Sequence, residues 1–370
     1  MSVTLLMWGA AGSAALHWEG EIVADQCPFM GFEVAGRMKS GRTVHGARRC
    51  IEVTMKFVAN TFLPTGATVM NRRYVTADVF TSNRFEGNPV AVVLDAEGLS
   101  TIQMQAITAE FGYSETTFVL PPRDAAHTAW VRIFTPSREI PFAGHPNIGT
   151  AFVLATRAAA SGTPLPDQLV FEEAAGLVPV TQMKDGGRVV GAELTVPERL
   201  TRASTLAVES VAACLSLDVT DIRTDAHAPQ VASVGLPFVV VELASREALR
   251  RSIPSLVDYK KVLPTDGATS IYAYTRDVGD DTSGDIQARM FTPRMTEDPA
   301  TGSATAAAVA LIADVRGVSE LSLRVRQGVD MGRPSTLITT VDVHDGQPRV
   351  RIGGKCVNVM EGSFLLDGEG

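Results

Sequence analysis

Hydrophobic and polar positions follow a regular pattern only from about residue 70 of this 370-residue chain. Runs rich in β-branched residues predict strands at 74–80 and 89–94, on either side of a turn-rich segment. Ser100 then opens a predicted helix, because Gln103 follows three residues later as a capping box requires and Gly112 stands at the expected C-terminal end. We expect four residues to form the apolar face of this helix: Leu99, Ile102, Ala106 and Ile107.

Two segments of the chain have nearly the same order of residues. RIFTPSREIPFAGHPNIGTAFVL occupies 132–154 and RMFTPRMTEDPATGSATAAAVAL occupies 289–311, and both pass from a strand through a glycine turn into a helix. The repetition predicts an α+β fold of two similar halves, each a mostly antiparallel sheet wrapped around a central helix. A cleft between two such halves is a favoured ligand site. The remaining pattern predicts strands at 114–120, 129–135, 232–243, 270–276, 285–293, 321–328, 335–343 and 349–354, and helices at 147–160 and 303–315.

The pattern divides the chain into three parts. Residues 70–196 form the expected first α+β half and residues 197–356 the second, and a last strand within 357–370 returns to the first half. Residues 1–69 show no clear strand alternation and no lasting helical period. This segment is therefore expected to be a flexible or poorly folded N-terminal extension outside the common fold.

Composition and charge exclude several classes of function. The net charge of −8 argues against a protein that binds nucleic acid without regard to sequence. No apolar run reaches the roughly 18 residues of a membrane span, so we expect a cytoplasmic protein with no membrane partner. The cysteines form no C-x-x-C pair and lie near no histidine cluster, which argues against a zinc site or a disulfide framework. We expect all four to be unreactive thiols: Cys27, Cys50, Cys214 and Cys356.

Each glycine turn leads into the N-terminus of a predicted helix. Unpaired backbone N–H groups and the helix dipole make such an end attractive to anions. Gly144 and Gly302 would let the backbone approach a ligand closely, and His145 and Ser303 would add side-chain donors. Two such ends facing one cleft could hold a carboxylate from opposite sides. The alternative is that both turns only cap their helices and bind no ligand.

Two acidic residues flank these turns in the expected fold. Glu115 stands at the start of a strand, and Asp298 precedes the second glycine turn. In a cleft, burial would raise the pKa of Glu115 above its usual value of about 4.3 and make it a usable proton carrier near neutral pH. At the surface, Glu115 would be a solvated side chain and Asp298 a cap for the turn that follows it.

Several longer segments resemble the phenazine-biosynthesis isomerase family, called PhzF-like, within the diaminopimelate-epimerase-like fold. The similarity runs in family order from about Tyr74 to the end of the chain and leaves out residues 1–69. The segments that carry it are DVFTSNRFEGNPVAVVLDAEGLS, AEFGYSETTFVLPP, RIFTPSREIPFAGHPNIGTA, ARMFTPRMTEDPATGSATAA and RQGVDMGRPS.

The resemblance implies a fold of two similar halves with the site between them, and a homodimer. The family's best-understood member isomerises trans-2,3-dihydro-3-hydroxyanthranilate with neither cofactor nor metal, and it uses a glutamate as its proton carrier. That glutamate matches Glu115 in SETTF. The other residues of the family site match His145, Asp298, Gly144, Gly302 and Ser303, with Ser114 as a weaker match.

Related proteins of this fold that epimerise amino acids or racemise proline use two facing cysteines. The matching positions here are Ala143 and Pro299, which disfavours two-thiol chemistry. The leading hypothesis is a cofactor-independent isomerase that moves a proton between carbons of a small, cyclic carboxylate, with Glu115 as general acid/base. In this hypothesis Asp298 either orients a polar group or shares in proton transfer, and His145 supports the reaction. The alternative is a ligand-binding or scaffold protein of the same fold without catalysis. A nucleotide binder is disfavoured, because the turn at Gly302 lacks the lysine of a P-loop.

Overall fold

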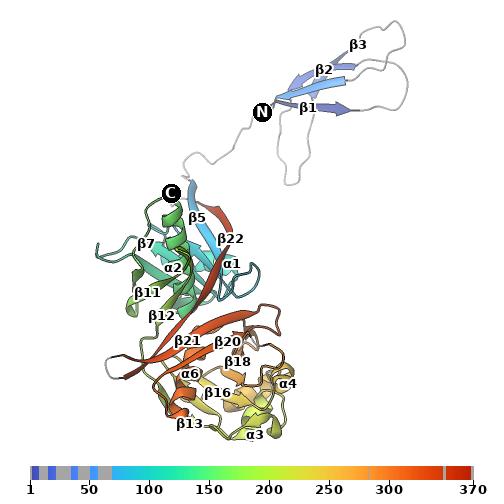
Figure 1. Ribbon diagram of the computed structural model, residues 1–370. Coiled ribbons are helices and arrows are strands. Elements are labelled where there is room, and N and C mark those ends of the chain that lie inside the picture. The colour runs from blue at the N-terminus through green and yellow to red at the C-terminus, as the bar shows by residue number, and fades with distance from the viewer. Residues whose placement is uncertain are drawn as a thin grey trace. The chain divides into compact units, whose positions relative to one another are not determined.

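The structure of the protein is a computed structural model, and it describes residues 2–7, 16–21, 35–40, 51–56, 69–281, 283–344 and 347–367 (Figure 1). The chain divides into two units. One comprises Met1–Val69 with Asp367–Gly370, and the other comprises Met70–Leu366. Every candidate site residue lies in the second unit. Two of the four cysteines, Cys27 and Cys50, lie outside the described residues.

The first unit contains four short strands. β1 (Ser2–Met7) pairs antiparallel with β4 (Ile51–Lys56), and β2 (Leu16–Glu21) pairs antiparallel with β3 (Ala35–Ser40). The sequence pattern did not reveal these four strands. Strands of six residues give a weak periodic signal, and the β1 and β4 partners are far apart in the sequence, so a local pattern does not reveal the pairing.

The second unit is built on a mixed sheet of eighteen strands. Its strands are β5 (Val69–Val79), β6 (Asn88–Val93), β7 (Glu115–Leu120), β8 (Ala129–Thr135), β9 (Arg138–Ile140), β10 (Gln168–Glu173), β11 (Gly176–Asp185), β12 (Arg188–Thr195), β13 (Thr201–Thr205), β14 (Ile222–Arg223), β15 (Gln230–Ser233), β16 (Pro237–Leu243), β17 (Ile271–Thr275), β18 (Ile286–Phe291), β19 (Glu297–Asp298), β20 (Leu321–Gln327), β21 (Ser335–His344) and β22 (Gln347–Asp367). Most neighbours are antiparallel, and the parallel pairs include β6–β7, β8–β10, β16–β17 and β18–β20.

A few helices complete the unit: α1 (Thr101–Phe111), α2 (Gly144–Ala160), α3 (Val208–Cys214), α4 (Arg246–Arg251), α5 (Leu256–Val262), α6 (Gly302–Arg316) and a 3₁₀ turn at Val219–Asp221. Most residues of α2 and α6 are buried, and both helices contribute to one apolar core. A side chain at Gly149 would place its Cβ 2.5 Å from Cγ1 of Val90. Helix α2 therefore packs closely against β6 because this position is a glycine.

The predicted features of α1 are confirmed at its ends, but along its face only Ile107 is confirmed. Ser100 and Gln103 form the capping box, and Gly112 ends the helix with a φ of 67°. However, Ile102 is 82% exposed, whereas Met104 is fully buried. Leu99 precedes the N-cap and does not belong to the helical face. The buried face consists instead of residues spaced as i, i+3 and i+4, which are Met104, Ile107 and Thr108.

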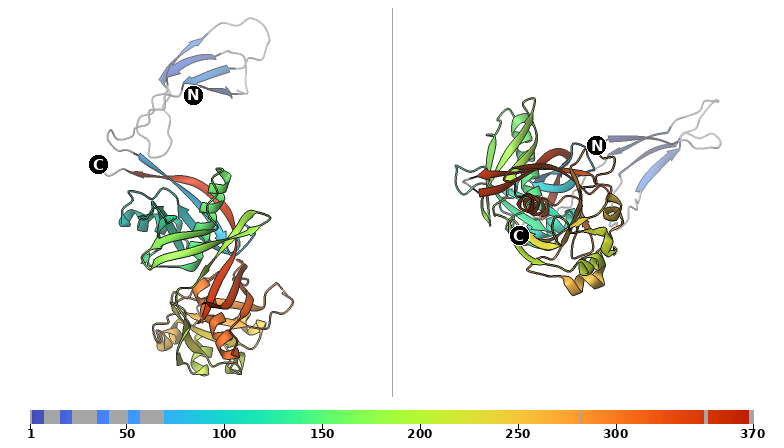
Figure 2. Two further views of the ribbon diagram at one scale, coloured as in Figure 1. Left: turned by 60° about the vertical axis from the view of Figure 1, so that its left-hand side comes forward. Right: turned by 60° about the horizontal axis from the view of Figure 1, so that its bottom comes forward.

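Other differences follow from weak local signals. The segment expected as one strand at 232–243 is divided by a turn into β15 and β16. Helix α2 begins three residues before the expected position 147, because a proline is tolerated in the first turn of a helix. Strand β22 joins the expected strands at 349–354 and within 357–370 into one strand, and it also neighbours β5 (Figure 2). Sequence analysis missed helices α3 to α5 and strands β10 to β14. Helices α4 and α5 have only six and seven residues, and strand β13 is exposed along its whole length, so their periodic signals are weak.

Candidate active site

The start of strand β7 meets the start of helix α2. Glu115 is the first residue of β7, and its side chain is 19% exposed. His145 is the second residue of α2, and its side chain is 7% exposed. Nδ1 of His145 lies 3.4 Å from Oε2 of Glu115, and Nε2 lies 3.4 Å from the carbonyl oxygen of Pro89. Sequence analysis predicted both residues, and the fold brings them into contact.

Burial shifts the protonation of both groups toward neutral forms. It raises the pKa of Glu115 to about 7, and a hydrogen bond from Ser114 opposes this rise. Burial also lowers the pKa of His145 to about 4, although the negative charge of Asp298 favours the protonated ring. At neutral pH the imidazole is therefore uncharged, and the carboxyl of Glu115 is poised between its acid and its base forms.

The contacts of His145 assign roles to its two ring nitrogens. The carbonyl of Pro89 can only accept, so Nε2 carries the single proton of the neutral ring when it donates there. Nδ1 is then unprotonated, and it lies 3.4 Å from Oε2 of Glu115. The neutral ring therefore presents an acceptor atom, not a positive charge, to the carboxyl of Glu115.

Asp298 lies in β19 and is tied in place by neighbouring side chains. Nδ2 of Asn88 donates to Oδ1 of Asp298 at 3.1 Å and to the carbonyl of Ala300 at 2.8 Å. The hydroxyl of Thr301 donates to the other carboxylate oxygen. Burial raises the pKa of Asp298 to about 6, the nearby charge of Glu115 adds to this rise, and the hydrogen bond from Thr301 opposes it.

Asn88 is hydrogen-bonded both to Asp298 and to Ser114, the residue before Glu115, and sequence analysis missed it. Its side chain is fully buried, and its Oδ1 accepts a hydrogen bond of 3.2 Å from the hydroxyl of Ser114, the neighbour of Glu115. A hydroxyl proton serves one acceptor at a time, so Ser114 divides its hydrogen bond between Asn88 and Glu115. The available signal was a polar residue at the first position of an otherwise apolar strand.

The two glycines stand at the first positions of α2 and α6. Neither helix has a side-chain cap hydrogen bond from its N-cap residue, Ala143 or Thr301. A Cβ added at Gly144 would meet no atom within 4 Å, and one at Gly302 would make only ordinary contact, 3.7 Å from Ile352. Packing within the protein therefore does not demand glycine at either place. A small residue there leaves space at a helix end that attracts anions.

The remaining candidates stand apart from these contacts. Ser303 is the second residue of α6 and is partly buried, and no contact described above includes its side chain. Cys214 and Cys356 are buried free thiols outside both turns, and burial raises their pKa values to about 11 and about 12. Within the described part of the chain, no three His, Cys, Asp or Glu side chains gather as metal ligands, and no helix is long and apolar enough to cross a membrane.

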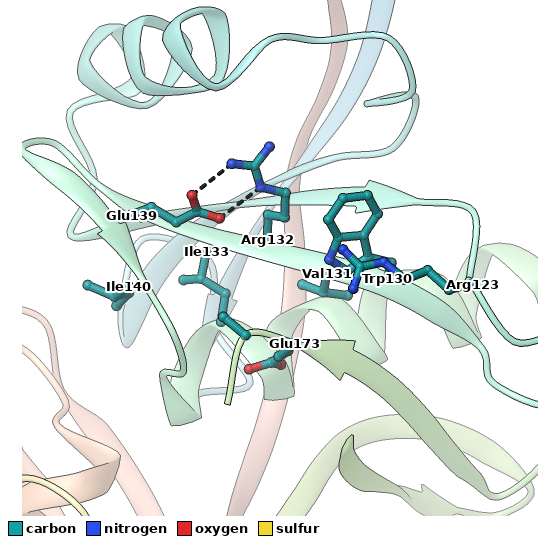
Figure 3. Close-up of a pocket in the computed structure, with 9 residues that line it drawn as sticks. Arg123, Trp130, Val131, Arg132, Ile133, Glu139, Ile140 and Glu173 are labelled. Carbon is teal, nitrogen blue, oxygen red and sulfur yellow. Dashed lines mark hydrogen bonds and ion pairs between the residues drawn. The ribbon is translucent and has the colours of Figure 1, made fainter. Parts of the chain in front are cut away.

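A separate pocket of about 100 Å³ lies at strand β8 (Figure 3). Both carboxyl oxygens of Glu173 are buried there, and burial raises the pKa of this group to about 8, while the side chain of Asn147 opposes this rise. None of the candidate site residues lines the pocket. Its lining consists of Arg123, Trp130, Val131, Arg132, Ile133, Glu139, Ile140, Glu173 and Ala174.

Comparison with known proteins places this geometry in a family. The family model described as phenazine biosynthesis-like protein, PhzC-PhzF, matches residues 77–362. An uncharacterized isomerase of Mesorhizobium japonicum is 38% identical over 310 residues, which cover 80% of this chain and 100% of the relative. The trans-2,3-dihydro-3-hydroxyanthranilate isomerase of Pseudomonas chlororaphis is 34% identical over 299 residues, which cover 79% of this chain and 99% of the relative.

Solved structures agree with this placement. A PhzF family phenazine biosynthesis protein of Bacillus anthracis has a TM-score of 0.71 and 25% identity, and the match covers 80% of this chain and 100% of that one. The mixed sheet with few helices agrees with these structures, and the relatives are named isomerases. The chain is therefore an isomerase. It belongs to the phenazine biosynthesis-like family, as the resemblance implied.

Proposed function

We propose that this isomerase moves a proton between carbon atoms of a small, cyclic carboxylate without a cofactor, with Glu115 as general acid and base. The observation that carries the proposal is the buried carboxyl of Glu115, with a pKa of about 7, in contact with the neutral ring of His145. A carboxyl that titrates near neutral pH can take a proton from one carbon and return it to another. A relative named for its action on a cyclic carboxylate supports the choice of substrate class.

In this mechanism the base form of Glu115 removes a proton from a carbon of the substrate. The electron pair left behind spreads over the conjugated substrate, and the protonated Glu115 then delivers its proton to a second carbon. The proton and the electron pair both stay within the pair of reactants, so no oxidant or reductant is needed. His145 orients the carboxyl proton through Nδ1, because its other nitrogen is held by Pro89.

The two helix ends bind the charge of the substrate in this proposal. The N-terminus of α2 at Gly144 and that of α6 at Gly302 offer backbone N–H groups and favourable dipoles to a carboxylate. Asp298 orients a polar substituent of the ring, because Asn88 and Thr301 hold its carboxyl in place. Binding and orientation then hold one proton carrier near both carbons.

We also infer that Met70–Leu366 is a duplicated unit of the diaminopimelate-epimerase-like kind, with halves at 70–196 and 197–356 around α2 and α6. The repeated segments at 132–154 and 289–311 support this, because each leads into a largely buried helix. Residues 1–69 fall outside the family match, so we expect a fragment from Met70 to Gly370 to fold alone. A calorimetric melting temperature well below that of the full chain would contradict this division.

The proposed reaction can be tested with the full chain after dialysis against a chelator. We would incubate it in D₂O with trans-2,3-dihydro-3-hydroxyanthranilate and a panel of small cyclic carboxylates, and follow the products by NMR. The proposal predicts an isomerised product, which carries solvent deuterium at the carbon receiving the proton to the extent that the carboxyl of Glu115 exchanges its proton with D₂O before delivery. Activity that returns only after a metal or an organic cofactor is added would contradict it. Tight binding of the same compounds without conversion would instead favour a binding protein.

A further inference from the structure

Two short hairpins of the second unit have matching registers. In the first, β8 returns as β9, and Phe134 stands opposite Glu139. In the second, β18 returns as β19, and Phe291 stands opposite Glu297. Each glutamate stands five positions before the first residue of a largely buried helix, α2 in the first case and α6 in the second. The hairpins therefore lead directly into the two glycine turns of the site.

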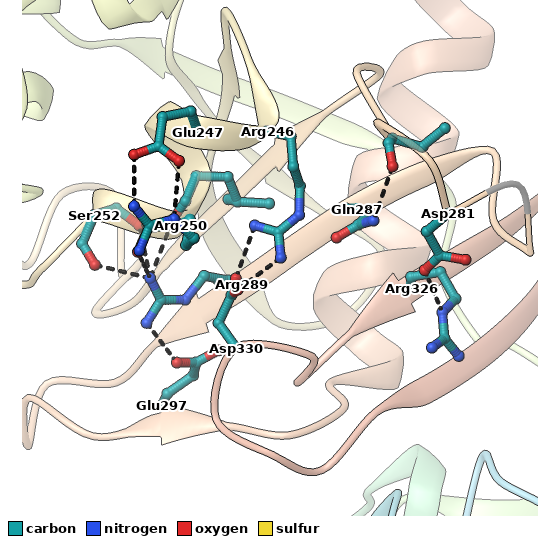
Figure 4. A network of polar contacts seen from close by, with 12 residues as sticks. Arg246, Glu247, Arg250, Ser252, Asp281, Gln287, Arg289, Glu297, Arg326 and Asp330 are labelled. Atoms are coloured by element: carbon teal, nitrogen blue, oxygen red, sulfur yellow. Dashed lines mark hydrogen bonds and ion pairs between the residues drawn. The ribbon is translucent and has the colours of Figure 1, made fainter.

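An arginine holds the glutamate in each hairpin. Arg132 donates from Nε and Nη2 to the two carboxylate oxygens of Glu139, both at 2.7 Å (Figure 3). Arg289 donates from Nη2 to Glu297 at 2.7 Å (Figure 4). Each guanidinium also lies over the phenylalanine of its own strand, at 5.2 Å from the ring centroid in the first hairpin and 4.8 Å in the second. Both hairpins thus contain an arginine–glutamate contact, with two hydrogen bonds in the first and one in the second.

The second contact is fixed more firmly than the first. Nη1 of Arg289 also donates to the backbone carbonyls of Leu249, Arg250 and Ser252 at the end of α4, at 3.0, 3.2 and 2.9 Å. A cation is favourable at this end of a helix, where carbonyl groups lack partners. The side chains of Arg289 and Glu297 are 13% and 10% exposed. Arg289 therefore links Glu297 to the end of α4.

We propose that Arg289, acting through Glu297, is a positioning residue that sets where the carboxyl of Asp298 lies, a role that rests on the proposed function of that aspartate. Successive side chains of a strand point to opposite faces. A Glu297 held toward α4 therefore directs Asp298 to the other face, where Asn88 and Thr301 contact it. The residue after the matching glutamate of the first hairpin is Ile140, so only the second contact controls a titratable site residue.

The protonation of Asp298 reports its position. The charged and titratable groups that face it are Glu115 from β7 and His145 from α2, and burial is the largest cause of its raised pKa. Glu297 is not among those causes. Glu297→Gln removes the same charge as Glu297→Ala, so a fall in the pKa of Asp298 that occurs only in Glu297→Ala comes from movement of its carboxyl and not from the lost charge.

The test is a ¹³C NMR titration of the Asp298 carboxyl in the ligand-free full chain, assigned with Asp298→Asn. Glu297→Ala frees β19 while Arg289 keeps its bonds to the carbonyls of α4. We expect the pKa of Asp298 to fall from about 6 by about one unit toward the usual aspartate value near 4, because the loosened carboxyl gains water. Glu297→Gln, which keeps an oxygen for the guanidinium, should restore most of the difference.

Arg246→Met is the matched control, because it breaks a different ion pair of α4, Arg246 with Asp330 at 2.6 Å (Figure 4). An Asp298 pKa that does not fall in Glu297→Ala, or that falls equally in this control, overturns the proposal. If Glu297→Ala does not fold, Arg289→Lys gives the same readout, since a lysine cannot hold the carboxylate and three carbonyls together. Full turnover in Asp298→Asn would overturn the proposed function of Asp298 and leave the positioning contact standing.

Discussion

The helix ends at Gly144 and Gly302 differ in chemistry although their backbones are alike. Both begin a largely buried helix without a side-chain cap. Beside the first, Glu115 has a raised pKa, and its contacts are a neutral imidazole at 3.4 Å and a shared hydroxyl. Beside the second, Asp298 is held by hydrogen bonds from Asn88 and Thr301. A group that must transfer a proton needs few strong partners, whereas a group that must orient a substrate needs several.

The largest expected effect comes from removing the proton carrier. Glu115→Gln keeps the shape of the side chain but cannot take up a proton, so we expect turnover to fall by about 10²-fold or more. The melting temperature near neutral pH should not decrease. Glu110→Gln, which changes an exposed glutamate of α1, is the control and should turn over normally.

A smaller loss of turnover is expected from substituting Asp298. Asp298→Asn keeps a hydrogen-bonding group in the same place, and we expect turnover to fall by roughly 10-fold with a rise in KM, as befits an orienting group. Steady-state kinetics on a converted substrate would measure both constants. A loss as large as that of Glu115→Gln would make Asp298 an equal partner in proton transfer and would end the division of roles.

The pH dependence of stability tests the raised pKa of Glu115. The pKa of Glu115 rises from 4.5 to about 7 on folding, so its stabilising effect is present below pH 4.5 and is lost as pH rises through 7. Glu115→Gln should therefore be more stable than the parent at pH 8, by on the order of 1–3 kcal/mol, with little gain at pH 4. Chemical denaturation at the two pH values measures this.

Glu173→Gln is the informative companion to that experiment. Burial raises the pKa of its carboxyl to about 8, but it lines a pocket outside the site. It should also gain stability at high pH while turnover stays within about 3-fold of the parent, since it touches none of the reacting groups. A collapse of turnover in Glu173→Gln would mean that the site extends to this pocket.

The smallest effect is expected from the thiols. Cys214 and Cys356 are buried and have raised pKa values, so neither is a thiolate near neutral pH. The combined Cys214→Ala, Cys356→Ala variant should keep its turnover if it folds. Near-complete loss in a variant whose circular dichroism is unchanged would revive thiol chemistry.

The sequence allowed prediction of those site residues whose neighbours are local. Glu115 was readable at a strand start, and His145 and Asp298 beside glycine turns, because each belongs to a recognisable segment. Asn88 was not readable, because its role depends on a contact with Asp298, 210 positions away. The hydrogen bonds from Arg289 to the carbonyls at the end of α4 could not be predicted either, because they join residues far apart in the sequence. In addition, α4 has only six residues and gives little periodic signal.

The most direct test of the proton carrier is the pH dependence of kcat/KM, measured in the Asp298→Asn background so that one acid of the site remains. This profile reports the ionisation of the free enzyme. If Glu115 must be ionised to take up the first proton, the rate constant should rise with pH through about 7, the pKa that burial gives this carboxyl. A profile that stays flat between about pH 5 and 8 would contradict the account, because no general base would then titrate in the range that Glu115 requires.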